Sequence, residues 1–296
     1  MSWQKLILQV PKHMAESASE YLEETGALSI TLEPAENEEL FEPAPGTTPL
    51  WQLTQLSALF AENTPLQDIL VGLKQAIAPE AIVHYSMETL ADQDWQKACT
   101  DAFSPQCFGE RLWICPSWHE PPEPDTPCVI LDPGLAFGTG AHPTTALCLE
   151  WLAQFMQAGD SVIDYGCGSG ILAIAALKLG AKEVWAVDND PQALEATLEN
   201  AKRNHCSPAA LHVMTPPQLP PLQVDILLAN ILANPLIHLA PELLSLLKPQ
   251  GKIVLSGILP QQADAVMAAY QSGGIAFSEP TIQDDWLRLE GTLSRF

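Results

Sequence analysis

A short segment near the middle of the chain, SVIDYGCGSG at 161–170, carries three glycines at alternate positions after an apolar run. Gly166, Gly168 and Gly170 allow a tight turn and let the backbone approach a ligand closely. A helix that begins at such a turn presents unpaired N–H groups and a positive partial charge. Asp164, just ahead of the turn, would repel a pyrophosphate and attract a cation. S-adenosylmethionine, with its ammonium and sulfonium groups, fits this combination; a tight turn that binds no ligand is the alternative.

The next apolar run ends in a second carboxylate, Asp188, 18 residues after Gly170. A carboxylate at the end of a strand can accept hydrogen bonds from a ribose diol, and nicotinamide-binding proteins share this feature. The glycine spacing favours S-adenosylmethionine over a nicotinamide dinucleotide, because the dinucleotide fingerprint G-x-G-x-x-G needs a glycine where this chain has Ile171. Asp188 could instead cap the helix that begins at Pro191, although Asp190 is better placed for that role.

Two further polar residues could face the same ligand. Asn230 ends the apolar run 225–230, where its amide could contact adenine, the ammonium group or an incoming amine, or simply form a turn. The Gly- and Pro-rich stretch 131–145 could cover the reacting centre. Within this stretch His142 precedes Pro143 at the expected start of a helix, so it is either a catalytic residue or a turn or capping residue.

From residue 128 onward, apolar runs of strand length alternate with helix-like segments. The expected strands are 129–131, 161–165, 183–188, 224–229 and 251–256, and the expected helices are 144–157, 170–179, 191–204 and 237–247. This alternation predicts an α/β fold with a mostly parallel sheet and helices on both faces, which binds ligands at the carboxyl ends of its strands. The segments 275–283 and 286–293 could add an antiparallel pair at the edge.

The first 88 residues have a different pattern. Strand-like and helix-like segments follow one another at 6–10, 15–25, 27–32, 51–60, 65–78 and 81–87. This β-α-β-β-α-β order predicts an α+β, ferredoxin-like domain at 1–88. We expect residues 89–127 to connect it to the second domain, at 128–296, through a short helix at 92–103 and a stiff proline-rich loop at 116–127.

The composition restricts the partners and the compartment. Thirteen Lys and Arg against 36 Asp and Glu give a net charge of −23, and the first 88 residues alone carry −10. Such a chain repels phosphate backbones, so nucleic acid is a poor partner. Alternatively, the acidic residues only form a solvated surface and recognise no partner. Seven cysteines without a C-x-x-C pair indicate neither a disulfide framework nor a metal site. No signal peptide or membrane-spanning run is recognisable, so we expect a cytoplasmic protein. Separately, we expect it to be a monomer.

Several runs together resemble one specific family. They are LDPGLAFGTGAHPTT, DYGCGSGILAIAALKLGA, AVDNDPQALEATLENAKRN, LLANILANPL and VLSGIL, with FGERLWICPSW at 108–118. This combination, which spans almost the whole chain, resembles the bacterial methyltransferases of ribosomal protein L11. The resemblance implies a Rossmann-like class I methyltransferase domain that uses S-adenosylmethionine, and a front domain that recognises the basic substrate protein. It also implies methylation of lysine and N-terminal amines, with Thr145, Gly166, Asp188 and Asn230 at the cofactor.

Three positions depart from the family pattern: Asn234 stands where Gly is common, Ala141 where Thr is common, and Cys99 near the usual place of a second Trp. No general base is recognisable, so we expect Asn230 to orient the acceptor amine while the amine's proton passes to water. The alternatives are a methyltransferase of another protein, a small molecule or nucleic acid, a nicotinamide oxidoreductase, and a non-catalytic sensor of adenosyl ligands.

Overall fold

The computed structural model describes residues 2–36, 49–91, 103–123, 125–132, 140 and 142–294. The chain forms two compact units, Met1–Ala98 and Cys99–Phe296, called here the first and the second unit. The division falls inside the connector that the sequence predicts at 89–127. The helix expected at 92–103 lies outside the described residues except for Phe103, which belongs to no element.

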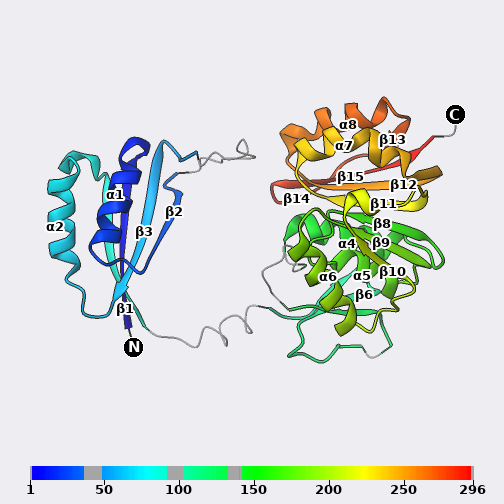
Figure 1. Ribbon diagram of the computed structural model, residues 1–296, viewed down its shortest axis with the longest axis horizontal. Helices are drawn as coiled ribbons and strands as arrows, with labels where there is room; N and C mark the ends of the chain where they lie inside the picture. The colour runs from blue at the N-terminus through cyan, green and yellow to red at the C-terminus, as the bar shows by residue number, and fades with distance from the viewer. Residues whose placement is uncertain are drawn as a thin grey trace. The chain divides into compact units, whose positions relative to one another are not determined.

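The first unit is an antiparallel sheet with two helices on one face (Figure 1). Its elements are β1 (Ser2–Pro11), α1 (Lys12–Glu24), β2 (Ser29–Pro34), β3 (Leu53–Ala61), α2 (Leu66–Ala76), a short 3-10 turn (Pro79–Ala81) and β4 (His84–Ala91). The strands lie in the order β2-β3-β1-β4. Leu6, Leu8 and Val10 alternate along β1 and are buried in the core with residues of both helices, as the two-residue period of a strand requires. This is the β-α-β-β-α-β order that the sequence predicts.

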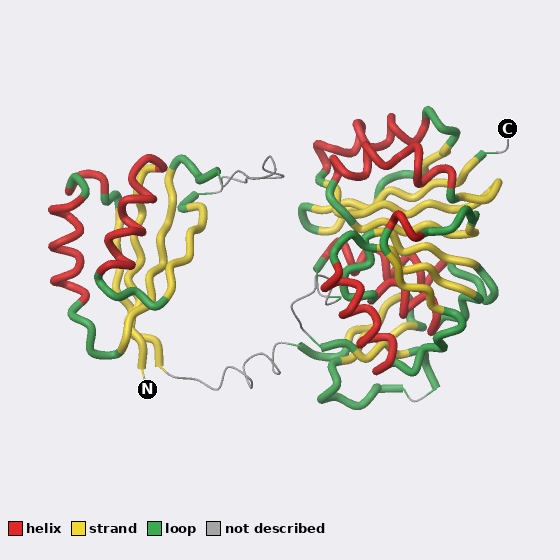
Figure 2. Tube along the Cα trace, viewed as in Figure 1, coloured by secondary structure: helices red, strands yellow, loops and turns green. Residues whose placement is uncertain are grey.

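A large, mostly parallel sheet forms the centre of the second unit (Figure 2). Its strands are β8 (Ser161–Tyr165), β9 (Glu183–Val187), β10 (Leu211–Met214), β11 (Val224–Asn230), β12 (Leu247–Ile258), β13 (Ile275–Phe277), β14 (Thr281–Gln283) and β15 (Trp286–Leu293). They lie in the order β10-β9-β8-β11-β12-β15-β13, with β14 paired to β15. The strands from β10 to β12 are parallel, whereas β15 is antiparallel to its neighbours. The expected α/β class with an antiparallel edge is confirmed.

Helices cover both faces of this sheet and enclose two apolar cores. They are α4 (Pro143–Phe155), α5 (Ile171–Lys178), α6 (Pro191–Arg203), α7 (Ala233–Ser245) and α8 (Ala263–Gln271). One core includes residues of α4 and α5, and the other includes residues of α7 and α8. The first six residues of α5 are all buried, because the helix is apolar around its whole circumference. A helix packed this way holds the glycine turn that precedes it in a fixed place.

Several expected boundaries were wrong. Residues expected to form only a connector contain two strands, β5 (Gln106–Phe108) and β6 (Leu112–Cys115), which form a small sheet with β7 (Cys128–Ile130). The helix α7 begins at Ala233 rather than at 237, because Pro235 lies in its first turn, where no backbone N–H needs a partner within the helix. The sequence analysis also missed the short edge strand β10 and the helix α8.

Candidate active site

The glycine turn that follows β8 has the backbone conformation that the sequence predicts. Gly166, Gly168 and Gly170 have φ values of +82°, +53° and +78°, a region that side chains with a Cβ rarely adopt. A Cβ added at Gly166 would overlap the side chain of Ile231. The Gly166 N–H donates to the Val187 carbonyl (2.7 Å), which ties the turn to the end of β9. In the sheet, β9 and β10 lie on one side of β8, whereas β11 and β12 lie on its other side. The turn at the end of β8 therefore lies at the point where the strand order reverses, which is the usual ligand position in such sheets.

Asp188 lies just beyond the end of β9 and is hydrogen-bonded to the glycine turn. Its Oδ2 accepts the Gly168 N–H (2.9 Å), and its Oδ1 accepts the Asp190 N–H (3.0 Å). Asp190 in turn caps α6 by accepting the Gln192 N–H (2.9 Å). The helix cap is thus Asp190, as the sequence suggested, and the half-buried Asp188 is placed beside the turn.

Asp164 is almost completely buried, with 1% of its surface exposed. Its Oδ2 accepts the Ala173 N–H (3.0 Å), whereas its Oδ1 is buried and has no hydrogen-bond partner among the described residues. Burial raises the pKa of the Asp164 carboxyl to about 7; the Ala173 hydrogen bond opposes this rise and the charge of Asp188 adds to it. A buried acceptor without a partner is costly, so this oxygen is suited to a cationic donor from a ligand.

A second pair of predicted residues meets at the end of the neighbouring strand. Asn230 is the last residue of β11, and its Nδ2 donates to the Oγ1 of Thr145 in the first turn of α4 (3.3 Å). Thr145 is fully buried, so the bond fixes the orientation of the half-buried amide. Thr145 and Asn230 therefore lie together at the carboxyl end of β11, next to the strand whose end carries the glycine turn.

His142 is the N-cap of α4, one of the two roles that the sequence left open. Its Nδ1 lies 2.8 Å from the Thr144 Oγ1 and accepts the Thr144 N–H at 3.4 Å. Burial lowers the pKa of His142, which favours the neutral imidazole. Of the stretch 131–145 that could cover the reacting centre, residues 133–139 and 141 lie outside the described residues, and so do the departures at Ala141 and Cys99.

Two residues of α6 that the sequence analysis missed donate hydrogen bonds to backbone carbonyls of the glycine turn. The Oγ1 of Thr197 donates to the Gly168 carbonyl (3.0 Å), and the Nδ2 of Asn200 donates to the Ser169 carbonyl (2.9 Å). They are three residues apart and so share one face of the helix. That spacing was the only available signal, and it does not by itself indicate contact with a turn 29 residues away.

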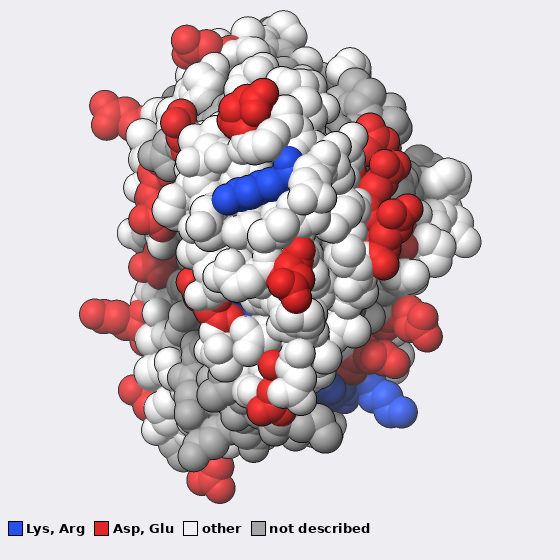
Figure 3. All heavy atoms as spheres, turned by 90° about the vertical axis from the view of Figure 1, so that its left-hand side faces the viewer, with Lys and Arg blue, Asp and Glu red and all other residues white. Residues whose placement is uncertain are grey.

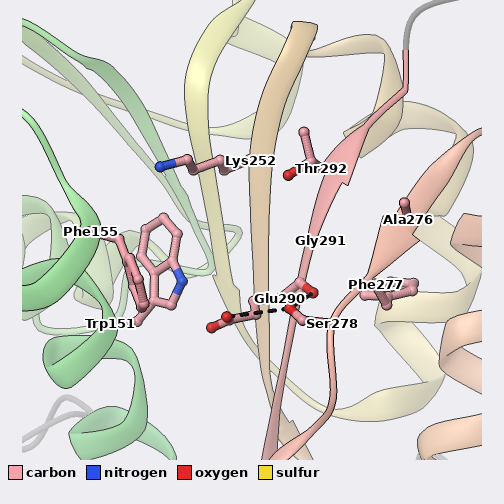
Figure 4. Close-up of a pocket in the computed structure, with 9 residues that line it drawn as sticks. All are labelled: Trp151, Phe155, Lys252, Ala276, Phe277, Ser278, Glu290, Gly291 and Thr292. Atoms are coloured by element: carbon pink, nitrogen blue, oxygen red, sulfur yellow. Dashed lines mark hydrogen bonds between the residues drawn. The ribbon is translucent and has the colours of Figure 1, made fainter.

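A surface hollow of about 370 Å³ lies elsewhere in the second unit, between α4 and the strands β12, β13 and β15 (Figure 4). The Trp151 and Phe155 rings lie on one side of it, and Glu290 and Ser278 on the other. Its charged groups already have partners in the protein. The Lys252 ammonium lies 5.8 Å from the Trp151 ring centroid, and Glu290 binds Arg288 (2.8 Å). None of the predicted site residues lines this hollow, and we assign it no role.

The described residues hold neither a candidate metal site nor a candidate membrane-spanning helix. No group of His, Cys, Asp or Glu there is arranged to hold a metal ion. None of the helices described is long and apolar enough to cross a membrane.

Comparisons with known proteins show what this chain is similar to. A family model described as "Ribosomal protein L11 methyltransferase (PrmA)" matches residues 2–294. Proteins named ribosomal protein L11 methyltransferase from Pseudomonas aeruginosa (strain LESB58) and Azotobacter vinelandii are 50% and 48% identical over 291 residues, covering 98% of this chain and 98% and 99% of theirs. Among solved structures, a ribosomal protein L11 methylase from Lactobacillus delbrueckii subsp. bulgaricus is 32% identical with a TM-score of 0.58, covering 65% of this chain and 100% of that one.

Proposed function

This chain belongs to the ribosomal protein L11 methyltransferase family, and on that premise we propose that it methylates ribosomal protein L11 with S-adenosylmethionine as methyl donor. The observation that carries the proposal is identity at 50% of positions over 98% of both chains, which includes the first unit as well as the second. Lysine side chains and the N-terminal amine are the acceptors that we propose, on the strength of the family resemblance. We further propose that the enzyme works as a monomer in the cytoplasm.

The residues present fit S-adenosylmethionine. The unpartnered Oδ1 of Asp164 is suited to an ammonium group. Asp188 is suited to the ribose diol, since a carboxylate can accept from both hydroxyls. We propose that these residues, together with Gly168, Gly170, Thr145 and Asn230, hold the cofactor.

The bound cofactor would supply a methyl group on a cationic sulfur: a neutral amine would form a bond to the methyl carbon in line as the carbon–sulfur bond breaks, and neutral S-adenosylhomocysteine would be the leaving group. A free lysine amine is protonated at neutral pH, since its pKa is about 10.4, and burial in a site lowers that pKa. We propose that Asn230 orients the amine: its Nδ2 is held by Thr145, which leaves its carbonyl oxygen to accept an amine N–H. His142 is engaged at Nδ1 as a helix cap, so we propose that the proton leaves to water.

We expect Asn230→Ala to lower kcat about tenfold, the cost of one lost hydrogen bond of roughly 1.4 kcal/mol, without shifting the pH profile. The profile should keep its position because Asn230 orients the amine and does not titrate. Steady-state rates across pH check this. Thr145→Val is the companion variant: it keeps the shape of Thr145 and removes the hydroxyl that accepts from Asn230, so it should also lower kcat, while any rise in the KM for S-adenosylmethionine reports the proposed contact of Thr145 with the cofactor. An unchanged rate in Asn230→Ala would remove Asn230 from the mechanism.

The substrate assignment is tested by incubating the enzyme with labelled S-adenosylmethionine and the ribosomal proteins of the same cell. We expect mass spectrometry to find the label on amines of ribosomal protein L11. Label on a different protein, or only on a small molecule, would replace L11 as the acceptor and keep the reaction class. No transfer in a single turnover would favour a sensor of adenosyl ligands.

We propose that the domain at residues 1–88, which lies within the first unit, recognises the substrate protein. It carries 13 acidic and 3 basic residues, and the acids of α1 are exposed, namely Glu16, Glu20, Glu23 and Glu24. The face in Figure 3 likewise shows many more acidic than basic side chains. Opposite charge steers association with a basic partner, and salt screens that attraction. The acceptor KM in the same assay should therefore rise with ionic strength; a KM indifferent to salt would leave the acids as a plain solvated surface.

A further inference from the structure

Two aromatic rings meet at the edge of the proposed site, although 144 positions separate them in the sequence. The centroids of His142 and Trp286 lie 5.3 Å apart with the ring planes at 63°, an edge-to-face pair. His142 caps α4, three residues before Thr145 in the first turn of that helix. Trp286 is the first residue of β15. Neither the proposed cofactor contacts nor the orientation of the amine by Asn230 gives this pair a role.

The sheet register places Trp286 at the ligand edge. Leu287 pairs with Ile258, the last residue of β12, and β15 runs antiparallel to that strand. Trp286, one residue earlier in β15, therefore lies at the carboxyl edge of the parallel strands. The same edge carries Asn230, which pairs with Ser256 of β12. The ring pair thus adjoins the Asn230–Thr145 pair along one edge of the sheet.

A buried arginine fixes the position of this hairpin relative to α4. Arg288, with 6% of its surface exposed, donates from Nη1 to the Leu147 carbonyl of α4 (2.8 Å). Its Nη2 donates to the Thr281 Oγ1 of β14 (3.0 Å) and to Glu290 (2.8 Å). The strands β14 and β15 are therefore tied both to each other and to the helix that His142 caps. Trp286 is held in place by the fold, as a binding surface requires.

The charge around the pair favours a cation. The turn between β14 and β15 consists of Asp284 and Asp285, both exposed and directly before Trp286. Burial lowers the pKa of His142, so its ring carries no positive charge that would repel a cation near neutral pH. The face of a tryptophan ring attracts alkylammonium groups, and more strongly once water is excluded.

We propose that Trp286, backed by His142, forms the wall of the acceptor site and binds the alkylammonium group of the substrate, both before deprotonation and as the methylated product. This inference rests on the proposed function, because it takes an amine of ribosomal protein L11 as the acceptor. It assigns Trp286 to binding of the acceptor and not of the cofactor.

The test measures binding of purified ribosomal protein L11 by calorimetry to enzyme loaded with S-adenosylhomocysteine. We expect Trp286→Leu to weaken L11 binding about five- to thirtyfold, the range of a desolvated cation–π contact, and Trp286→Phe to weaken it by less than about threefold. Affinity for S-adenosylhomocysteine itself should stay unchanged in both variants. Equal losses in the Leu and Phe variants, or no loss in either, would overturn the proposal.

Trp185→Leu is the matched control, because Trp185 also pairs with a histidine, His212, at 5.3 Å, but within β9 and its edge neighbour β10. It should bind L11 like the wild type. Methylation by the wild type is measured first: if the wild type does not methylate L11, the proposed function is wrong. If the wild type methylates L11 and the Trp286 variants bind it normally, only the present inference is wrong.

Discussion

Asp188→Ala is expected to weaken binding of S-adenosylhomocysteine at least about a hundredfold. A ribose diol bound by a carboxylate makes two charge-assisted hydrogen bonds, each worth about 1.5–3 kcal/mol. The same carboxylate also accepts the Gly168 N–H (2.9 Å), so its removal leaves a donor of the glycine turn without its partner. The two effects act together on the surface that the cofactor occupies. Calorimetric titration with S-adenosylhomocysteine measures the change.

Asp190→Ala is the matched control, two residues along the same loop. Asp190 accepts the Gln192 N–H as the cap of α6, so its loss should cost about 1 kcal/mol of stability and leave the affinity within about twofold. Similar losses of affinity in both variants would mean that the loop as a whole, and not the carboxylate of Asp188, holds the ligand. Tight binding of NADH by the wild type, with no heat from S-adenosylhomocysteine, would contradict the assignment of the cofactor.

The sequence predicted those parts of the fold in which local signals agree. The strand β8 is an apolar run that ends in the glycine turn, and its observed bounds are the expected ones. The helix α6 has Pro191 at its first position and Asp190 as a cap, and it ends within one residue of its expected end. By contrast, β10 has only four residues at a sheet edge, too few to establish a period. The helix expected at 237–247 left out Pro235, although the first turn of a helix tolerates proline and α7 begins at Ala233.

The site was predictable only to the extent that it depends on residues at strand ends. Asp164, Asp188 and Asn230 each follow an apolar run, and parallel strands bring such ends to one edge. The position of Trp286 depends on the register of β15 against β12, and its ring contact joins segments 144 positions apart. The unpartnered oxygen of Asp164 depends on packing around α5. Such long-range relations have no local sequence signal.

The buried carboxyl of Asp164 is expected to make the cofactor-free enzyme less stable as pH rises from about 4 to about 7. Its pKa is raised from 3.8 to about 7, so over this interval the folded chain keeps a proton that the unfolded chain has lost. The free energy of unfolding then falls by about 1.4 kcal/mol per pH unit from this group, on the order of 4 kcal/mol in total. Above about pH 7 the loss is complete, and below about pH 4 it is absent.

Asp164→Asn isolates this contribution from that of the other acids, because the amide does not ionise and its oxygen can still accept the Ala173 N–H. Urea unfolding of both proteins across this pH range should show the stability of the variant, relative to the wild type, rising with pH. If the free energies of unfolding of the two proteins changed with pH in parallel, Asp164 would ionise normally in the folded chain.

Folding keeps a proton on Asp164, whereas cofactor binding should release that proton. An ammonium group beside the unpartnered Oδ1 favours the ionised carboxylate, so binding below about pH 7 must release the proton. Affinity for S-adenosylhomocysteine should therefore rise up to about tenfold per pH unit between about pH 5 and pH 7 in the wild type, and stay flat in Asp164→Asn. Calorimetry in two buffers of different ionisation enthalpy counts the released protons directly. If the wild type releases none, the ammonium group does not lie at Asp164, and the burial of this carboxylate needs another ligand to explain it.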